Sequence, residues 1–95
     1  MIGGGLSNTA SGFANSLAGG LFNSASNFGS SIGGGSNNSA SGSNATIPGG
    51  SQNQATQTSS FAAGNQAPAL HQGAFVWADS TTAAFASSAS GAWRT

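Results

Sequence analysis

The stretch IGGGLSNTASGFANS, residues 2–16, begins a pattern that recurs every 15 residues. The three rows that follow are LAGGLFNSASNFGSS (17–31), IGGGSNNSASGSNAT (32–46) and IPGGSQNQATQTSSF (47–61). In every row column one is Ile or Leu, columns three and four are Gly, column seven is Asn and column nine is Ala. A register of five columns held through four rows is not expected from a bias toward Gly and Ser alone.

A period of 15 residues indicates one turn of a narrow β-coil. It is too short for helix-pair repeats, which need about 30 residues or more. Stacked coils would place Asn above Asn and Ala above Ala at roughly 4.7–4.8 Å, the spacing of paired strands. Asn in column seven is expected to adopt the left-handed region or to bond its own turn. The repeat therefore predicts an all-β fold, a parallel β-solenoid of about five 15-residue coils.

Two columns have predicted structural roles. The glycine pairs allow positive φ and close backbone approach, so we expect them at the corners of the coils; these turn glycines are Gly4, Gly5, Gly19, Gly20, Gly34, Gly35, Gly49 and Gly50. One large aliphatic side chain per coil is too little for a monomeric core. We therefore expect column one to meet copies of itself on the axis of a homotrimer; this predicted oligomer core is Ile2, Leu17, Ile32 and Ile47.

Composition and charge exclude several kinds of function. The chain has one acidic residue, Asp79, one basic residue, Arg94, and a single histidine, His71. Nucleic acids and anionic membrane surfaces are recognised through many Lys and Arg residues, so neither is an expected partner. No apolar stretch of about 18–20 residues is present, which predicts no membrane insertion within this segment. The absence of Cys excludes disulfides and thiolate metal sites.

Three other structures fit the sequence less well than the solenoid. A chain rich in Gly, Ser, Asn and Gln is often a flexible linker, but a linker has no reason to keep an aliphatic residue at every fifteenth position. A helix is disfavoured because paired glycines recur and no 3.6-residue apolar stripe runs through the rows. Collagen requires Gly at every third position, which this chain lacks.

The segments IGGGLSNTASG, LAGGLFNSASN and IGGGSNNSASG resemble the repeats of trimeric autotransporter adhesin heads and of related phage tail fibres. The resemblance extends over residues 2–80 and implies a left-handed parallel β-roll, a homotrimer and a location on a cell surface or a virion fibre. Residues 2–61 form the regular repeats, 62–80 a degenerate coil with a capping strand, and 81–95 an irregular tail. In rows of 15, Ala62 and Trp77 fall in column one, and Phe75 and Trp77 are assigned to the cap.

The sequence offers little for catalysis or metal binding. His71, Asp79 and one of the serines could be imagined as a triad, but a narrow solenoid has little concave volume for an oriented histidine and an oxyanion pocket. One His and one Asp do not complete a metal site either. The sequence thus predicts no catalytic residue, no metal site and no cofactor, and the protein is not expected to be an enzyme.

The leading hypothesis is a non-catalytic structural or adhesive module of an extracellular trimeric fibre. Its expected partners are copies of itself and a host glycan or matrix protein. The alternative is a self-assembling subunit of an extracellular filament that has no specific ligand. An ice-binding solenoid is disfavoured because it needs a flat row of threonines, which is not formed by Thr9, Thr46, Thr56 and Thr58.

Overall fold

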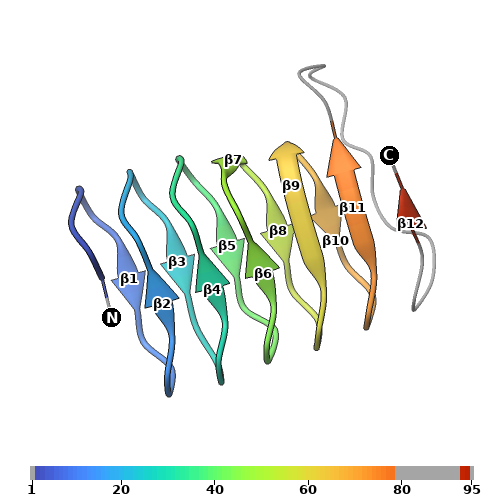
Figure 1. Cartoon of the computed structure of the whole chain (residues 1–95), viewed down its shortest axis with the longest axis horizontal. Coiled ribbons are helices and arrows are strands. Elements are labelled where there is room, and N and C mark those ends of the chain that lie inside the picture. Colours follow the sequence, from blue (N-terminus) through green and yellow to red (C-terminus); the bar gives the residue numbers. More distant parts are fainter. Residues whose placement is uncertain (1, 79–92, 95) are drawn as a thin grey trace.

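The computed structural model describes residues 2–78 and the short strand Trp93–Arg94. These residues contain twelve short strands and no helix. All of the pairings between the strands are parallel, and the strands stack in two sheets as a solenoid of about five coils. The predicted all-β parallel solenoid is confirmed (Figure 1).

Each coil contributes one strand to each sheet. The sheet that contains column nine consists of β1 (Thr9–Ala10), β3 (Ser24–Ala25), β5 (Ser39–Ala40), β8 (Gln54–Ala55) and β10 (Pro68–Ala69). The sheet that contains column one consists of β2 (Ser16–Leu17), β4 (Ser31–Ile32), β6 (Thr46–Ile47), β9 (Phe61–Asn65), β11 (Phe75–Ala78) and β12 (Trp93–Arg94). A short strand at the corner, β7 (Gly50–Ser51), also pairs with β9.

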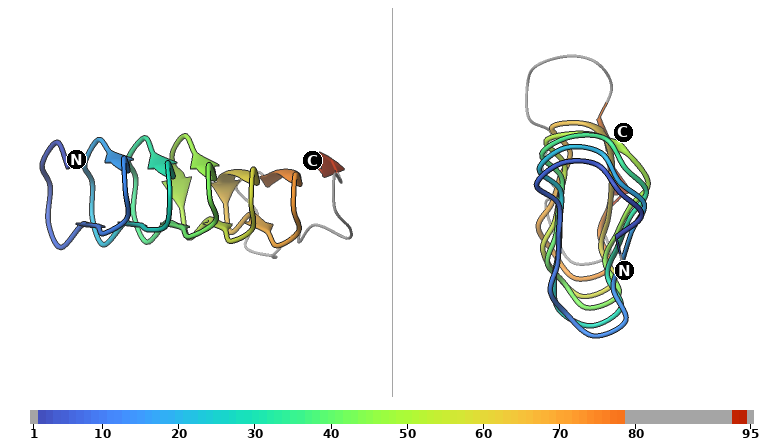
Figure 2. Two further views of the ribbon diagram at one scale, coloured as in Figure 1. Left: turned by 90° about the horizontal axis from the view of Figure 1, so that it is seen from below. Right: turned by 90° about the vertical axis from the view of Figure 1, so that its left-hand side faces the viewer.

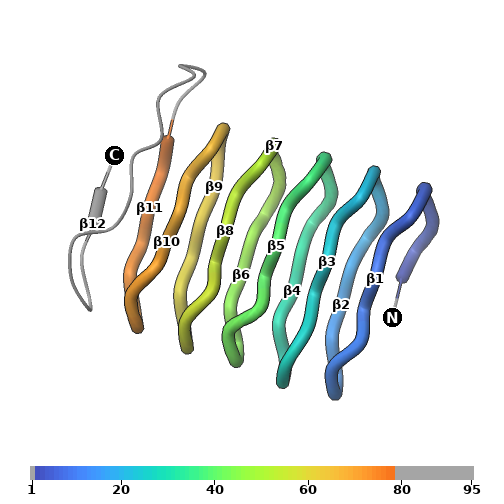
Figure 3. Tube along the Cα trace, turned by 180° about the vertical axis from the view of Figure 1, so that it is seen from behind, coloured from blue at the N-terminus to red at the C-terminus, as the bar shows by residue number. Residues whose placement is uncertain are grey.

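The chain passes repeatedly between the two sheets. In Figure 1 it rises along the near sheet, crosses at the top and descends along the far sheet, moving toward β12 with each coil. Figure 2 shows the stacked coils from below and end-on, and Figure 3 shows the column-nine sheet from behind. This path is a left-handed coil. We call the top of Figure 1, where columns two to six cross between the sheets, the glycine-rich edge, and the bottom, with columns ten to thirteen, the opposite edge.

The register follows the repeat through four rows and then shortens. Leu17 pairs with Ile32 and Ile32 with Ile47, each 15 residues apart, as predicted. The next coil is one residue shorter, because Ala69 pairs with Ala55.

The shorter coil shifts the residues that follow it. Val76 lies opposite Ala62, whereas Trp77 lies opposite Ala63. Column one of the last coil is therefore the buried Val76, and the prediction that Trp77 takes this position is wrong.

The core lies inside each coil. Leu17, Ile32 and Ile47 are 0%, 2% and 0% exposed within a single chain. The prediction that they meet at an intermolecular axis is thus wrong, because the chain itself already encloses them. Few large side chains are needed, since the alanines of column nine fill the space opposite them and are also fully buried; these are Ala25, Ala40, Ala55 and Ala69. Ile2, in the first coil, is 42% exposed.

The corners depend on glycine and on unusual backbone angles. Seven of the eight predicted turn glycines have positive φ, and Gly49 is the exception. Every coil also places one residue of column six and one of column thirteen in the left-handed region. The column-six residues are Ser7, Phe22, Asn37, Gln52 and Gln66, with φ between 55° and 60°. Column seven does not have positive φ, and its asparagines instead show the other predicted behaviour, bonding their own turn, as where the Asn38 side chain donates to the carbonyl of Gly34.

The C-terminal part of the column-one sheet is paired on both sides. Strand β11 pairs with β9 and also with β12. The strand predicted as a cap is therefore not the outermost one, and β12 comes from the part of the chain that was predicted to be irregular. Phe75 stacks on Phe61 with ring centroids 4.5 Å apart, which ties β11 to the preceding coil.

Candidate binding grooves at the glycine-rich edge

A ladder of asparagines holds the glycine-rich edge in place. The side-chain amide of Asn38 donates to the carbonyls of Gly34 and Gly50 at 2.9 and 3.0 Å. Its side-chain oxygen accepts from the backbone amide of Asn53, one coil further, at 3.0 Å. Asn8, Asn23 and Asn53 repeat this arrangement, and three of the four asparagines are buried. The backbone of this edge is therefore fixed from inside.

The residue before each ladder asparagine projects from this edge. Asn37, Gln52 and Gln66 occupy column six, and their left-handed backbone reverses the direction of hydrogen bonding. Their amides donate back to the preceding coil, as from Gln52 to Ser36, whereas neighbouring extended residues donate forward. The Gln66 side chain donates to the Gln52 side-chain oxygen at 2.9 Å.

These side chains line a shallow groove on the side of the column-nine sheet. The groove has a volume of about 400 Å³ and is lined by Asn37, Gln52, Gln54, Gln66 and Pro68. Amide side chains supply both donors and acceptors. Because residues 2–78 contain no Asp, Glu, Lys or Arg, this surface can recognise a neutral polar ligand but has no charged side chain with which to bind an ion. We call it the amide groove.

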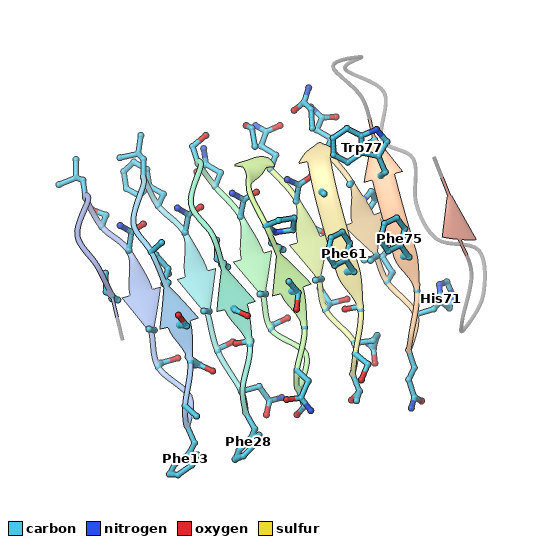
Figure 4. The ribbon with its side chains drawn as sticks, viewed as in Figure 1. Phe13, Phe28, Phe61, His71, Phe75 and Trp77 are labelled. Carbon is cyan, nitrogen blue, oxygen red and sulfur yellow. The ribbon has the colours of Figure 1, made fainter. Side chains whose placement is uncertain are left out.

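A second groove lies on the side of the column-one sheet. It has a volume of about 280 Å³ and is lined by Pro48, Gly49, Gly50, Ala63, Gly64 and Trp77. Trp77 stands at the top of β11 and is 49% exposed (Figure 4). We call it the tryptophan groove. Only the paired segments Gly50–Ser51 and Gly64–Asn65 separate it from the amide groove along the chain.

Exposed apolar side chains gather on the first two coils. Leu6, Leu21 and Phe22 lie at the glycine-rich edge and are 63%, 38% and 54% exposed. At the opposite edge Phe13 stacks on Phe28 with centroids 5.4 Å apart, and both rings are exposed (Figure 4). In the third coil the corresponding positions hold Ser36, Asn37 and Ser43. The third coil thus lacks the exposed apolar side chains of the first two, and among the described residues large exposed apolar side chains recur only further along, at Leu70 and Trp77.

The remaining candidates do not come together in the part of the chain that the structure describes. His71 is partly exposed near the opposite edge, and its backbone oxygen accepts from Ala74. Asp79, its imagined partner in a triad, lies outside the described residues. Within the described ranges no three His, Asp or Glu side chains form a group that could hold a metal ion. No helix of this part is long and apolar enough to cross a membrane.

The sequence did not single out the glutamines or the tryptophan groove. Column six varies among Ser, Phe, Asn and Gln, so it gave no repeat signal. The useful signal was the alternation of this variable residue with the recurring Asn of column seven, which indicates one side chain pointing outward and one inward.

A scan against protein-family models finds no match for the chain, and a search of curated proteins finds no relative of it.

Proposed function

We propose that the chain is a non-catalytic structural and adhesive module of an extracellular trimeric fibre, either a cell-surface adhesin head or a phage tail fibre. Its ligand is a host glycan or a matrix protein. The observation that carries the proposal is the exposed row of Asn37, Gln52 and Gln66, held in register by the buried asparagine ladder. A row of side-chain amides on a fixed backbone loses little backbone conformational entropy when a ligand binds.

The neutral surface supports adhesion by repeated polar contacts. Each amide offers weak hydrogen bonds that compete with water. Several of them on one chain, multiplied by three chains, raise the overall affinity through effective concentration. The lack of charged residues in 2–78 makes such binding insensitive to salt.

Because the column-one side chains are buried within each chain, the proposed trimer must form through another surface. Leu6, Leu21 and Phe22 provide exposed apolar area on the first two coils, which is the kind of surface that self-association covers. A trimer joined through these coils leaves the amide groove, on coils three to five, open to a ligand. The proposal therefore separates the assembling coils from the binding coils within one solenoid.

The asparagine ladder does not continue beyond Asn53 into the fifth coil. The backbone amide of Ala67 donates to the side-chain oxygen of Asn53, but alanine has no side-chain amide with which to extend the row. The alternative, a filament subunit without a ligand, predicts long uniform filaments in electron micrographs of the purified chain.

The adhesive role is tested by the binding of the purified protein to immobilised collagen, fibronectin, laminin and a panel of neutral glycans, followed by biolayer interferometry. We expect saturable binding to at least one probe. The double variant Gln52→Ala/Gln66→Ala should lose most of it, because the amide groove loses its central donors. The matched variant Gln57→Ala/Gln72→Ala removes two exposed glutamines from the opposite edge and should bind normally. Equal binding by both variants, or no binding to any probe, would contradict the proposal.

A further inference from the structure

Gly49 is a glycine that the fold itself does not require. A Cβ added to its neighbour Gly50 would overlap the backbone oxygen of Gly64, and Gly50 has φ of 103°. Gly49 has no positive φ, and a Cβ added to it would meet no atom within 4 Å. Neither backbone strain nor packing therefore excludes a side chain at position 49. What its glycine does provide is a flat, open floor for the tryptophan groove.

Trp77 forms the wall above this floor. It lies on β11 between Val76 and Ala78, both of which are buried, while its own side chain is half exposed. Its paired neighbour in the sheet is Ala63, too small to cover an indole ring. The groove thus combines an exposed aromatic face with a floor of glycine, alanine and proline. Its lining is apolar, and it adjoins a surface rich in hydrogen-bonding amides.

We propose that the tryptophan groove binds the apolar face of a neutral pyranose ring, so that the ligand of this module is an uncharged glycan. The C–H bonds on one face of such a ring fit the negative π-face of an indole. The hydroxyls of the ring, or of the next sugar, then reach Gln52 and Gln66 across the ridge of β7 and β9. A sugar thus has an apolar ring face that matches the tryptophan groove and polar hydroxyls that match the amide groove. This inference rests on the adhesive function proposed above and names its ligand.

The absence of charged side chains in the lining of the grooves indicates which glycans they can bind. The described residues that line the two grooves carry no charged side chain, and the single histidine lies near the opposite edge. Among these lining residues a sialylated or sulfated sugar would find no cationic partner to replace the water around its charge. Neutral hexose or N-acetylhexosamine chains meet no such cost. The groove therefore selects uncharged sugars over charged ones.

The test uses cellohexaose, chitohexaose and maltohexaose as probes, titrated into the full chain and followed by indole N–H shifts in NMR spectra and by tryptophan fluorescence. We expect at least one of them to bind saturably and to shift the Trp77 signal. Trp77→Ala should weaken binding at least about tenfold, as for a central aromatic contact. Gly49→Val should weaken it similarly, because the added side chain fills the groove without disturbing the coil.

Phe13→Ala is the matched control, since it removes an exposed ring from the opposite edge. It should leave the affinity unchanged. Sugar binding that survives both Gly49→Val and Trp77→Ala would overturn the proposal. A proline-rich peptide is titrated as a competing probe, and tighter binding of this peptide than of any of the sugars would also overturn it. If the matrix proteins still bind through Gln52 and Gln66 while no neutral sugar binds, this inference fails and the adhesive function stands. If no probe binds in either experiment, both fail.

Discussion

Asn38 and Asn53, one coil apart, are joined by a hydrogen bond of 3.0 Å from the backbone amide of Asn53 to the side-chain oxygen of Asn38. The Asn38 side chain bonds two glycine carbonyls as well, one in its own coil and one in the next. A single buried side chain thus satisfies three backbone groups at a corner where the strands are only two residues long. Stacking of the coils therefore depends on this polar contact in addition to apolar burial.

Replacing Asn38 with alanine should strongly destabilise the fold. The change leaves the buried amide of Asn53 without this partner and removes one bond from each of the partly buried carbonyls of Gly34 and Gly50. Because an unsatisfied buried group costs about 1–3 kcal/mol, we expect the free energy of unfolding to fall by at least about 2 kcal/mol, measured by urea denaturation followed by circular dichroism. Asn8→Ala is the control, because Asn8 lies in the first coil and is only partly buried, so water can replace its bonds. Equal losses in the two variants would show that burial of the ladder is unimportant.

Replacement by alanine should destabilise the protein strongly at one glycine of this edge and only slightly at another. Gly35 has φ of 91°, and an added Cβ would overlap the backbone oxygen of Gly50. Gly35→Ala should therefore cost at least about 2 kcal/mol from backbone strain and overlap. Gly49→Ala should change stability by less than about 1 kcal/mol, because position 49 meets neither constraint. Thermal unfolding of the two variants measures the difference, and a loss for Gly49→Ala as large as that for Gly35→Ala would refute the assignment.

The repeat could be predicted because each coil uses the same backbone. Columns one, four, seven and nine face the interior or the next coil, where only one kind of residue fits, so their identities recur and reveal the period. The shorter fifth coil could not be predicted in the same way. The segment from Ala62 to Gly64 aligns equally well with two registers in the sequence, and the observed pairings, such as that of Gly50 with Gly64, decide between them.

The position of the core was mispredicted for a physical reason. Counting large side chains suggested that one aliphatic residue per coil could not close a monomer. A flattened coil encloses so little volume that alanine opposite isoleucine fills it, and the buried asparagines occupy the rest. The amide groove escaped prediction because column six faces outward, where many residues are tolerated. Ser7 and Phe22 also adopt the left-handed conformation of column six, although neither residue type is typical of it.

Ile32→Ala tests the interior location of column one. Its side chain is 2% exposed within one chain, so its truncation should leave a cavity and cost about 2–5 kcal/mol. The sedimentation coefficient of the protein that remains folded should not change. Leu6→Ala truncates an exposed side chain and should alter the unfolding free energy by less than about 0.5 kcal/mol. If Ile32→Ala instead dissociated an oligomer and left the stability of each chain intact, column one would have to be intermolecular.

Self-association through the first coils can be tested with a variant that copies the third coil. Leu21 pairs with Ser36, and Phe22 occupies the same column as Asn37. The variant Leu21→Ser/Phe22→Asn therefore carries residues that this backbone already accepts, and Asn suits the left-handed angle better than Phe.

We expect the wild-type chain to sediment as a trimer and this variant as a folded monomer, since the variant removes two of the exposed apolar side chains that the trimer would bury. Phe28→Ser is the matched control, because it copies Ser43 of the third coil at the opposite edge and should remain trimeric. Loss of the trimer in both variants would place the contact elsewhere, and a monomeric wild-type chain would reject the trimer altogether.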